Sequence, residues 1–522
     1  MTEIVPNWLE QRAYTSPQHP ALVCEGRPIS YGELSTRVKT ATGRLRSLGI
    51  GRGDRLALLM ANRPEFVELL HAAGRVGTAI VPLNSRLSPP EIAQQLWDCQ
   101  PRILFYDRST RETAFQAKVE SRKFKVGDGS SDRGVWLAIS VDSDWRDGET
   151  AFDTIAVTAD QGGNTIDLSA THSIIFTSGS SGRPKGVQLT FANVFWSAIA
   201  AGLNLGVHTD DRWLVCLPFC HVGGLSVLLR SVIYGTTAVV HNGFDPVRVD
   251  RALEDDRVTI ISMVANMLQR LLETRGGRPA PPWLRSVITG GGPMPPALLR
   301  ASRERGFPVT QAYGLTEAAS QVTGLAPAEA ERKLGSAGKP LLGFEVRLRG
   351  VEGAVAAGEV GEILVRGPAV SPGYLDPADD KNREDGWLCT GDLGRFDDEG
   401  FLYIVGRRDD MVISGGENIY PAEVEAALQA HPAVAESCVF GIPDERWGAA
   451  VAACVRLAPG PSVTADELAE HVRRHLARFK VPRRIEFVGD FPRTAAGKII
   501  RHQVCAAFVS EHMSTASNEP GG

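Results

Sequence analysis

The chain has 522 residues, and its 43% hydrophobic and 22% charged content is typical of folded globular proteins, which excludes intrinsic disorder for most of its length. Its 61 acidic residues outnumber its 56 basic residues by five, so the composition predicts no nucleic-acid partner. The eight cysteines are scattered, as in a reducing compartment, and no apolar run approaches the roughly 18 residues that span a bilayer. We therefore predict a cytoplasmic protein without membrane insertion.

The first part of the chain alternates between helix and strand patterns. Ser30 and Glu33 predict a capping box before an apolar helical face that ends at Gly49. Apolar strands are expected at 55–60, 78–82 and 102–107, with helices between them, one of them at 65–73. Strand, helix and strand in succession predict parallel α/β layers. Residues from about 120 to 170 are richer in Gly, Ser and Asp, and we expect irregular connections and edge strands there.

The pattern changes after about residue 345. Residues 346–349 and 362–366 alternate with a period of two, which predicts antiparallel strands. From Tyr420 onward we expect a small α+β unit, with a helix opened by Pro421, strands at 435–440 and 449–457, and a second helix capped by Thr464 and Glu467. The predicted fold is α/β: a large multi-layer N-terminal domain with parallel or mixed sheets (1–408), a small C-terminal α+β domain (409–512) and a disordered tail (513–522).

The densest chemical signal lies at residues 175–187, where an apolar strand runs into a loop rich in glycine and hydroxyl groups that ends at Lys185. Such a loop can wrap phosphate oxygens with backbone N–H groups. It is not a Walker A loop, because Pro184 stands where that motif requires glycine, and Gly186 follows the lysine in place of serine or threonine. The stretch alone also fits a flexible loop, but the preceding strand and the lysine favour phosphate binding.

Residues 177–186 resemble the signature loop of the adenylate-forming superfamily, which includes acyl-CoA synthetases, luciferases and peptide-synthetase adenylation domains. Ser180 and Ser181 replace the threonines usual in the family and keep the hydroxyl groups. Further family motifs follow in order at 311–317 (QAYGLTE), 390–392 (TGD) with 406–407 (GR), and 492–498 (PRTAAGK). The resemblance implies ATP, Mg²⁺ and CoA as ligands, with a C-terminal domain that rotates between two half-reactions.

The resemblance also implies roles for single residues. Lys498 would touch both the substrate carboxylate and the α-phosphate of ATP, where charge builds during adenylate formation. Glu317 would hold Mg²⁺ and Thr316 would donate to phosphate; together with Lys498 and His221 they are the expected catalytic residues. Tyr313 would lie against adenine, and the TGD and GR motifs would bind ribose. The expected ATP-binding residues are Thr177, Ser178, Gly179, Ser180, Ser181, Gly182, Lys185, Gly291, Gly292, Tyr313, Thr316, Asp392 and Arg407.

The charged run at 406–410 fits a solvated turn, and its position suggests a linker between domains. By resemblance, Asp409 is the hinge of the rotating domain. Gly415 and Gly416 would give the pantetheine arm of CoA room to pass, because glycine presents no side chain. A simple turn is the alternative for these two glycines.

Several stretches resemble the 2-succinylbenzoate–CoA ligase family more narrowly: residues 6–9 (PNWL), 216–226 (CLPFCHVGGLS), 289–293 (TGGGP), 320–321 (SQ) and 415–421 (GGENIYP). A substrate with two carboxylates requires a cation for the carboxylate that does not react, and we expect Arg230 to supply it. His221, Gly290 and Gln311 would line the acyl site. The alternatives are an exposed helical position for Arg230 and a structural role for His221.

Two departures from that family lie near the expected acyl pocket. Gly223 stands where serine is frequent, and Ala265 and Asn266 replace a proline and a threonine. These changes bear on which acid is bound rather than on the type of reaction.

The sequence thus predicts an ATP-dependent acid–thiol ligase that converts 2-succinylbenzoate and CoA to the thioester, as in menaquinone biosynthesis, with release of AMP and pyrophosphate. The open alternatives are a related aryl- or acyl-CoA ligase, an adenylating enzyme that loads a carrier protein, and a non-catalytic member. The intact Lys498, Glu317 and Asp392 argue against the last. The expected partners are the small carboxylate, ATP and CoA, and the oligomeric state is left open, a homo-oligomer included.

Overall fold

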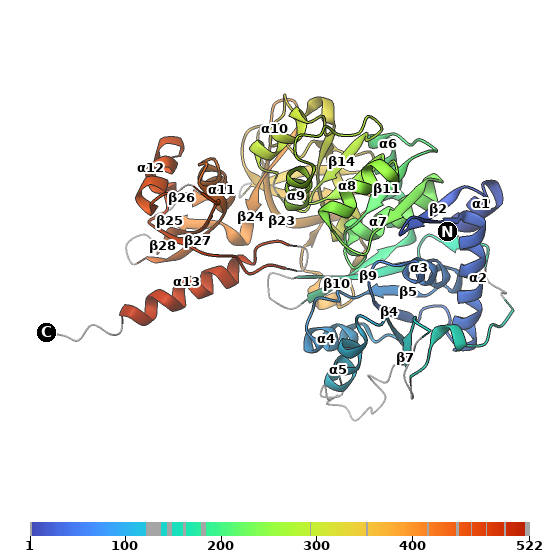
Figure 1. The fold of residues 1–522 in the computed structure, drawn as a ribbon. Helices are drawn as coiled ribbons and strands as arrows, with labels where there is room; N and C mark the ends of the chain where they lie inside the picture. The colour runs from blue at the N-terminus through green and yellow to red at the C-terminus, as the bar shows by residue number, and fades with distance from the viewer. Residues whose placement is uncertain are drawn as a thin grey trace. The chain divides into compact units, whose positions relative to one another are not determined.

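The computed structural model describes residues 3–121, 137–143, 149–159, 163–178, 184–292, 294–350, 353–414, 417–444, 448–460, 462–476, 478–494 and 497–516. Contacts divide the chain into two units (Figure 1). The first comprises Met1–Gly291, Ala301–Glu345 and Val365–Leu388, and the second comprises Gly292–Arg300, Val346–Leu364 and Cys389–Gly522. Each unit is described by itself.

A seven-stranded sheet in the first unit has the order β21-β10-β9-β5-β4-β6-β7, parallel from β9 to β7 and antiparallel at β10 and β21. Leu56 and Leu58 of β4 pack on the side of α2 and α3, whereas Ala57 and Leu59 pack on the side of α4 and α5. A strand that is apolar on both faces is typical of a buried parallel sheet. The elements are β4 (Arg55–Leu59), β5 (Ala79–Pro82), β6 (Ile103–Tyr106), β7 (Leu137–Ser140), β9 (Thr171–Ser178), β10 (Pro184–Thr190), β21 (Gly373–Tyr374), α2 (Tyr31–Ser47), α3 (Pro64–Val76), α4 (Pro89–Cys99) and α5 (Arg111–Ser121).

A nine-stranded sheet in the same unit has the order β17-β16-β15-β14-β13-β11-β12-β2-β3, parallel from β15 to β2. Its elements are β2 (Pro20–Cys24), β3 (Arg27–Ser30), β11 (Arg212–Val215), β12 (Thr237–Val240), β13 (Ile260–Met263), β14 (Ser286–Thr289), β15 (Val309–Leu315), β16 (Ser320–Leu325), β17 (Lys339–Pro340), α6 (Phe191–Leu205), α7 (Val222–Tyr234), α8 (Pro246–Asp255) and α9 (Ala265–Arg275). The remaining elements are α1 (Trp8–Thr15), α10 (Pro296–Glu304) and the pair β1 (Ile4–Pro6) and β8 (Thr165–Asp167).

Both sheets are doubly wound. The chain leaves β4 for β5 on one side and then adds β6 on the other, and it repeats this order with β11, β12 and β13. Ligands of such sheets bind beyond the carboxyl ends of the strands where the order reverses. The loops after β4 and β11 are therefore the first places to look for a site.

The second unit contains most of a sheet of order β19-β18-β20-β23-β22, with β24 paired to β23, in which β18 with β19, β22 with β23 and β23 with β24 are antiparallel. It also contains a separate three-stranded sheet of order β27-β28-β29. The odd residues of β28 pack with α11 and α12, and the even residues pack with α13. The elements are β18 (Glu345–Gly350), β19 (Gly353–Ala354), β20 (Gly361–Arg366), β22 (Arg383–Glu384), β23 (Trp387–Phe396), β24 (Leu402–Arg407), β25 (Val412–Ser414), β26 (Glu417–Ile419), α11 (Pro421–Gln429), β27 (Val434–Asp444), β28 (Gly448–Leu457), α12 (Ala465–His475), β29 (Arg484–Phe487) and α13 (Arg501–Ala516).

The predicted fold class is confirmed, and most predicted elements lie within two residues of their observed bounds. At α2 the capping box forms only in part: Ser30 accepts from the Glu33 amide, but the Glu33 carboxylate pairs with Arg37 instead. The predicted tail is partly helical, because α13 runs to Ala516, and 517–522 lie outside the described residues. The contact-based division also joins 389–408 to the C-terminal part, whereas the boundary at Asp409 stays a prediction.

Candidate active site

The phosphate-loop motif is carried by a β-hairpin. Thr177 in β9 lies opposite Lys185 in β10, and its hydroxyl donates to the Lys185 carbonyl oxygen at 3.4 Å. Gly179, Ser180, Ser181 and Gly182 lie outside the described residues, as does the side chain of Ser178. The Lys185 Nζ lies 3.7 Å from Asp379 Oδ1 and 5.5 Å from the centre of the Tyr374 ring.

Glu317 and Lys185 meet around the same tyrosine. The Tyr374 hydroxyl donates to Glu317 Oε1 at 2.8 Å and accepts from Asn382 Nδ2 at 3.3 Å. Burial and then the Glu317 charge raise the pKa of Tyr374, so the hydroxyl keeps its proton at neutral pH. Thr316 begins the 3₁₀ turn η2 (Thr316–Ala318) that carries Glu317. The first unit thus joins the lysine of the phosphate loop and the expected Mg²⁺ ligand.

The strand before this turn carries the expected adenine and acyl residues. Tyr313 and Gln311 are both largely buried in β15, and Gln311 Nε2 has no hydrogen-bond partner among the described residues. Gly290 follows the neighbouring β14, and a side chain there would bring its Cβ to 3.0 Å from the Ala312 carbonyl oxygen. Gly291 comes next and is exposed. These residues therefore meet at the carboxyl ends of two parallel strands. Gly292 is also exposed but falls in the second unit.

His221 stands at the N-cap of α7, at the end of the loop that follows β11. Its backbone N–H donates to the Pro218 carbonyl oxygen at 3.1 Å. Gly224 allows the helix to begin close to this loop, because a Cβ there would lie 2.5 Å from the same oxygen. His221 is thus held by its own loop as well as by its helix.

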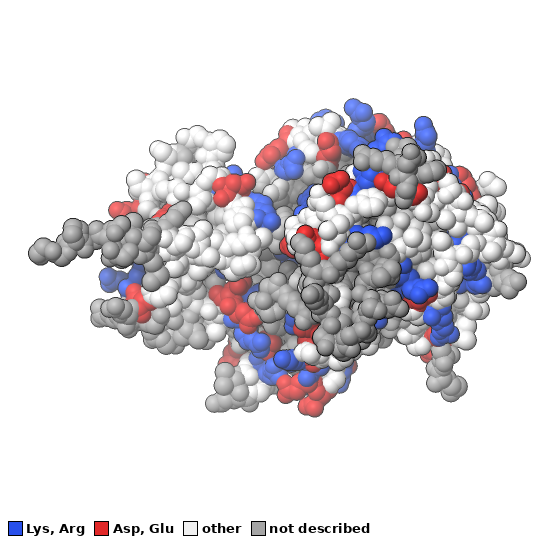
Figure 2. Space-filling model, turned by 90° about the horizontal axis from the view of Figure 1, so that it is seen from below, with Lys and Arg blue, Asp and Glu red and all other residues white. Residues whose placement is uncertain are grey.

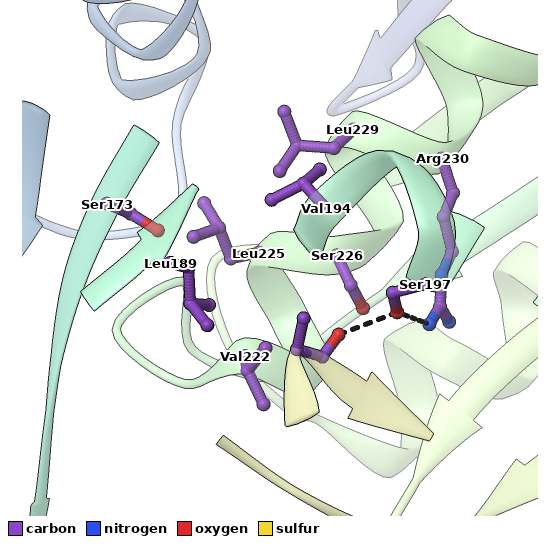
Figure 3. Close-up of a pocket in the computed structure, with 10 residues that line it drawn as sticks. Ser173, Leu189, Val194, Ser197, Val222, Leu225, Ser226, Leu229 and Arg230 are labelled. Carbon is purple, nitrogen blue, oxygen red and sulfur yellow. Dashed lines mark hydrogen bonds between the residues drawn. The ribbon is translucent and has the colours of Figure 1, made fainter. Parts of the chain in front are cut away.

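Arg230, two turns further along α7, is not the exposed helical residue of the alternative interpretation. It is 3% exposed, and its guanidinium donates to Gln321 Oε1 at 3.3 Å. It also donates to Ser197 Oγ at 3.1 Å (Figure 3). Ser197 in turn donates to the Ala319 carbonyl oxygen at 2.7 Å. Burial lowers the pKa of Arg230, and the hydrogen-bond partners of its guanidinium among the described residues are a side-chain amide and a hydroxyl, not a carboxylate. A buried arginine without a counter-ion is costly unless a ligand supplies one.

A small cavity of about 10 Å³ adjoins this arginine, enough for about one water. Figure 3 shows it lined on one side by Val222, Leu225 and Leu229 of α7. Arg230, Ser197 and Ser226 are the polar side chains of α6 and α7 that line it.

The second unit brings together the TGD motif (390–392) and the GR motif (406–407). Asp392 in β23 lies opposite Arg407 in β24, and the Arg407 Nε lies 2.8 Å from Asp392 Oδ1. Glu362 of the neighbouring strand β20 accepts from the Gly391 N–H at 3.2 Å and pairs with Arg408 at 3.1 Å. The backbone of β23 just before Asp392 is thus held from a neighbouring strand.

The charges of Asp392 and Arg407 also act on Lys498. The turn that carries it is closed by the Thr494 N–H, which donates to the Lys498 carbonyl oxygen at 2.7 Å. Desolvation lowers the pKa of Lys498, the like charge of Arg407 acts in the same direction, and Asp392 opposes them. The structure therefore groups Lys498, Asp392 and Arg407 within one unit.

The expected hinge residue, Asp409, is exposed in the turn η5 (Arg408–Asp410) directly after β24. Ser414 pairs with Glu417 across β25 and β26, on either side of Gly415 and Gly416, which lie outside the described residues. The roles predicted for these three residues stay predictions.

The donor set fits Mg²⁺ bound together with a nucleotide. No group of three His, Cys, Asp or Glu side chains suited to a metal occurs in the described ranges. Mg²⁺ commonly takes only one or two protein carboxylates and completes its shell with phosphate oxygens and water. The Glu317 carboxylate, with one oxygen engaged by Tyr374, supplies a hard oxygen of this kind.

Sequence reasoning missed Tyr374 and Asp379, which contact the expected site residues Glu317 and Lys185, and Glu362, which bonds to Gly391 next to Asp392. None of them lies in a motif, and Tyr374 is 57 residues from Glu317 along the chain. Only the pairing of β21 with β10 brings it to the hairpin.

On the face shown in Figure 2, basic and acidic side chains are interspersed. No helix in the described part of the chain is both long and apolar enough to cross a bilayer.

The chain matches the family model described as AMP-binding enzyme over residues 9–375, and that described as AMP-binding enzyme C-terminal domain over residues 423–498. The 2-succinylbenzoate–CoA ligase of Bacillus licheniformis is 41% identical over 501 residues, which cover 96% of this chain and 99% of that protein. The solved structure of o-succinylbenzoate CoA synthetase from Bacillus subtilis with its acyl-adenylate intermediate is 39% identical, covers 96% of this chain and 98% of that one, and has a TM-score of 0.87. The amide bond synthetase McbA from Marinactinospora thermotolerans is 28% identical, with 97% and 100% coverage and a TM-score of 0.85.

Proposed function

Because the chain belongs to the AMP-binding enzyme family, we propose that it is an AMP-forming acid–thiol ligase that joins 2-succinylbenzoate to CoA. The observation that carries the proposal is the extent of the likeness to 2-succinylbenzoate–CoA ligases, 41% identity over 96% of the chain. The solved relatives were obtained with ATP and magnesium ion and with a CoA product analogue. ATP, Mg²⁺ and CoA are accordingly the ligands of the reaction.

In the first half-reaction a carboxylate oxygen of the substrate attacks the α-phosphorus of ATP, and pyrophosphate leaves. Negative charge grows on the phosphoryl oxygens, so fixed cations and N–H donors lower the barrier. We assign Lys498 to the α-phosphate and the attacking carboxylate, and Lys185 with Thr316 to the outer phosphates. Mg²⁺ held by Glu317 neutralises phosphate charge. The Tyr374 hydroxyl orients the Glu317 carboxylate through its 2.8 Å bond.

We assign Asp392 to binding the ribose of the nucleotide. A carboxylate can accept from both ribose hydroxyls, and the ion pair with Arg407 fixes the direction in which its oxygens point. In the second half-reaction the CoA sulfur attacks the acyl carbon, the bond to AMP breaks, and the thioester and AMP are released. Asp409 is the residue about which we expect the C-terminal part to rotate between these steps.

Arg230 supplies the charge for the carboxylate that does not react. Its burial without an acidic partner among the described residues supports this role, because a ligand carboxylate would complete the pair. Gln321 and Ser197 hold the guanidinium from two sides, which fixes its fork for a planar anion. His221, Gly290 and Gln311 are assigned to the rest of the acyl site.

The test is release of pyrophosphate from ATP and Mg²⁺ with 2-succinylbenzoate, with and without CoA, beside benzoate and octanoate. A CoA-dependent preference for 2-succinylbenzoate is expected. Turnover of benzoate or octanoate in its place would keep the adenylation chemistry and overturn the substrate.

A second acceptor is favoured by one observation, the likeness to an amide bond synthetase at 28% identity. An enzyme of that kind forms the adenylate but passes the acyl group to an amine. Pyrophosphate release without thioester on addition of CoA, and amide on addition of an amine, would favour it. The 41% identity to CoA ligases makes the thioester the expected product.

A further inference from the structure

Asn62 lies in the loop after β4, and its side chain reaches the loops that follow two strands of the other sheet. Its Nδ2 donates to the carbonyl oxygens of Leu217 at 2.9 Å and His241 at 3.1 Å, and its Oδ1 accepts from the Phe219 N–H at 3.0 Å. The residue is 8% exposed. One amide thus ties together the carboxyl ends of β4, β11 and β12, where both doubly wound sheets reverse their strand order.

The Asn62 clamp, by which we mean the three hydrogen bonds of this amide, holds the loop just before His221. Leu217 and Phe219 flank Pro218, which has no N–H of its own, and the Pro218 carbonyl oxygen accepts from the His221 N–H at 3.1 Å. Asn62 therefore holds the peptide group on each side of Pro218, the residue whose carbonyl oxygen binds the His221 N–H. The Phe219 ring, 4.9 Å from that of Phe66, adds a second contact with the same half of the unit.

We propose that Asn62 is a positioning residue for the acyl site, which sets the place of His221 and thereby the binding of the acid; this rests on the proposed function. Loss of the amide would remove the Asn62 partner of the Leu217 carbonyl oxygen and of the Phe219 N–H, whereas the His241 carbonyl oxygen would keep its bond from the Gly243 N–H at 2.8 Å. The loop would move to find new partners, and a shift of about 1 Å at a reacting group can cost about 10²-fold in rate.

The chain offers a matched control in Asn193, at the start of α6. It is 5% exposed, donates to the carbonyl oxygens of Pro368 and Val370 at 2.9 Å each, and accepts from the Thr190 N–H at 2.9 Å. Its chemistry and burial equal those of Asn62, but its partners lie outside the His221 loop. A role in stability alone would be the same at both positions.

The experiment compares Asn62→Asp with Asn193→Asp in the adenylation half-reaction of the full chain. Both variants are expected to lower the melting temperature. Only Asn62→Asp should raise the KM for 2-succinylbenzoate, by about tenfold or more, with the KM for ATP changed by less than about twofold. An acid KM within about twofold of wild type, or the same rise in Asn193→Asp, would overturn the proposal. If Asn62→Asp does not fold, Asn62→Ser takes its place, since the small hydroxyl keeps one donor.

A double-mutant cycle with His221→Ala tests whether the clamp acts through the histidine. The effect of Asn62→Asp on the acid KM should shrink when His221 is already absent, and full additivity would count against the proposal. Failure of the proposed substrate is distinguishable: wild type would then turn over another acid, and the two asparagine variants would be compared on that acid.

Discussion

Tyr374 connects the two charges that the first unit offers to a nucleotide: its hydroxyl is bonded to Glu317 at 2.8 Å, and the Lys185 ammonium lies 5.5 Å from the centre of its ring. Tyr374→Phe removes the bond and keeps the ring. A hydrogen bond to a charged group is worth about 1.5–3 kcal/mol, so the KM for MgATP should rise by about tenfold or more. Initial rates at varied MgATP measure this, with melting temperature as the control for folding.

Glu317→Gln gives the matched comparison, because the amide keeps the shape and loses the charge. It should raise the Mg²⁺ concentration needed for half-maximal rate well beyond the effect of Tyr374→Phe. If Tyr374→Phe leaves both the ATP and the Mg²⁺ dependence unchanged, the tyrosine does not orient the carboxylate.

Lys498→Ala should slow adenylation by about 10²–10³, the usual loss for one transition-state donor. It should leave thioester formation from preformed acyl-adenylate largely intact. The two half-reactions are followed separately, by pyrophosphate release and by thioester formation from synthetic adenylate. Lys480→Ala, which removes a lysine of the same unit that pairs with Glu423, serves as the control. An equal loss in both half-reactions would contradict the assignment of Lys498 to the first step alone.

Arg230→Met should raise the KM for 2-succinylbenzoate by about 10²-fold and that for benzoate by less than about threefold, since only the first acid has a second carboxylate. The melting temperature should not fall steeply, because a buried charge without an acidic partner is replaced by an apolar chain of similar length. Arg230→Lys keeps the charge but loses the planar fork, so its KM for 2-succinylbenzoate should lie between those of wild type and Arg230→Met. Equal changes for both acids would remove Arg230 from the substrate site.

Two histidines make the stability of the first unit depend on pH. Burial lowers the pKa of His71 to about 4, and burial together with the nearby His71 lowers that of His172 to about 3. The unfolded chain, with a histidine pKa of about 6.5, then binds more protons than the folded one below that pH. The contribution of these histidines to the free energy of unfolding is therefore fully present above about pH 6.5. It decreases towards pH 4, by up to about 1.4 kcal/mol per pH unit for each histidine.

Melting temperatures between pH 7.5 and 4.5 check this dependence. His172→Gln should flatten the fall, whereas the exposed His208→Gln should leave it unchanged. Parallel curves for wild type and His172→Gln would show that the acid sensitivity comes from other groups.

The fold was predictable where local chemistry decides it. The apolar patterns predicted β4, β5 and β6 to within one residue and α3 to within three, and the Thr464–Glu467 capping box is formed in full. At α2 the competing ion pair with Arg37 could not be foreseen from the capping pattern. Candidate site residues could be named from the sequence where a motif is contiguous, as for Lys185, Glu317, Asp392 and Arg407, and their roles stay predictions.

The rest of the site depends on tertiary contacts. Tyr374 reaches Glu317 because β21 pairs with β10, and Glu362 reaches Gly391 because it lies in a neighbouring strand of the sheet. Asn62 contacts Leu217 across 155 residues. No spacing in the sequence encodes such pairs, since each follows from how two loops meet after the sheets have formed.

The three-stranded sheet of the second unit is covered on both faces, by α11 and α12 on one and by α13 on the other. Its apolar surface is thus enclosed by its own helices. Lys498 is attached to a body whose backbone entropy was already lost on folding. The rotation proposed about Asp409 would therefore need a change only at that turn, with no rearrangement inside the three-stranded sheet and its helices.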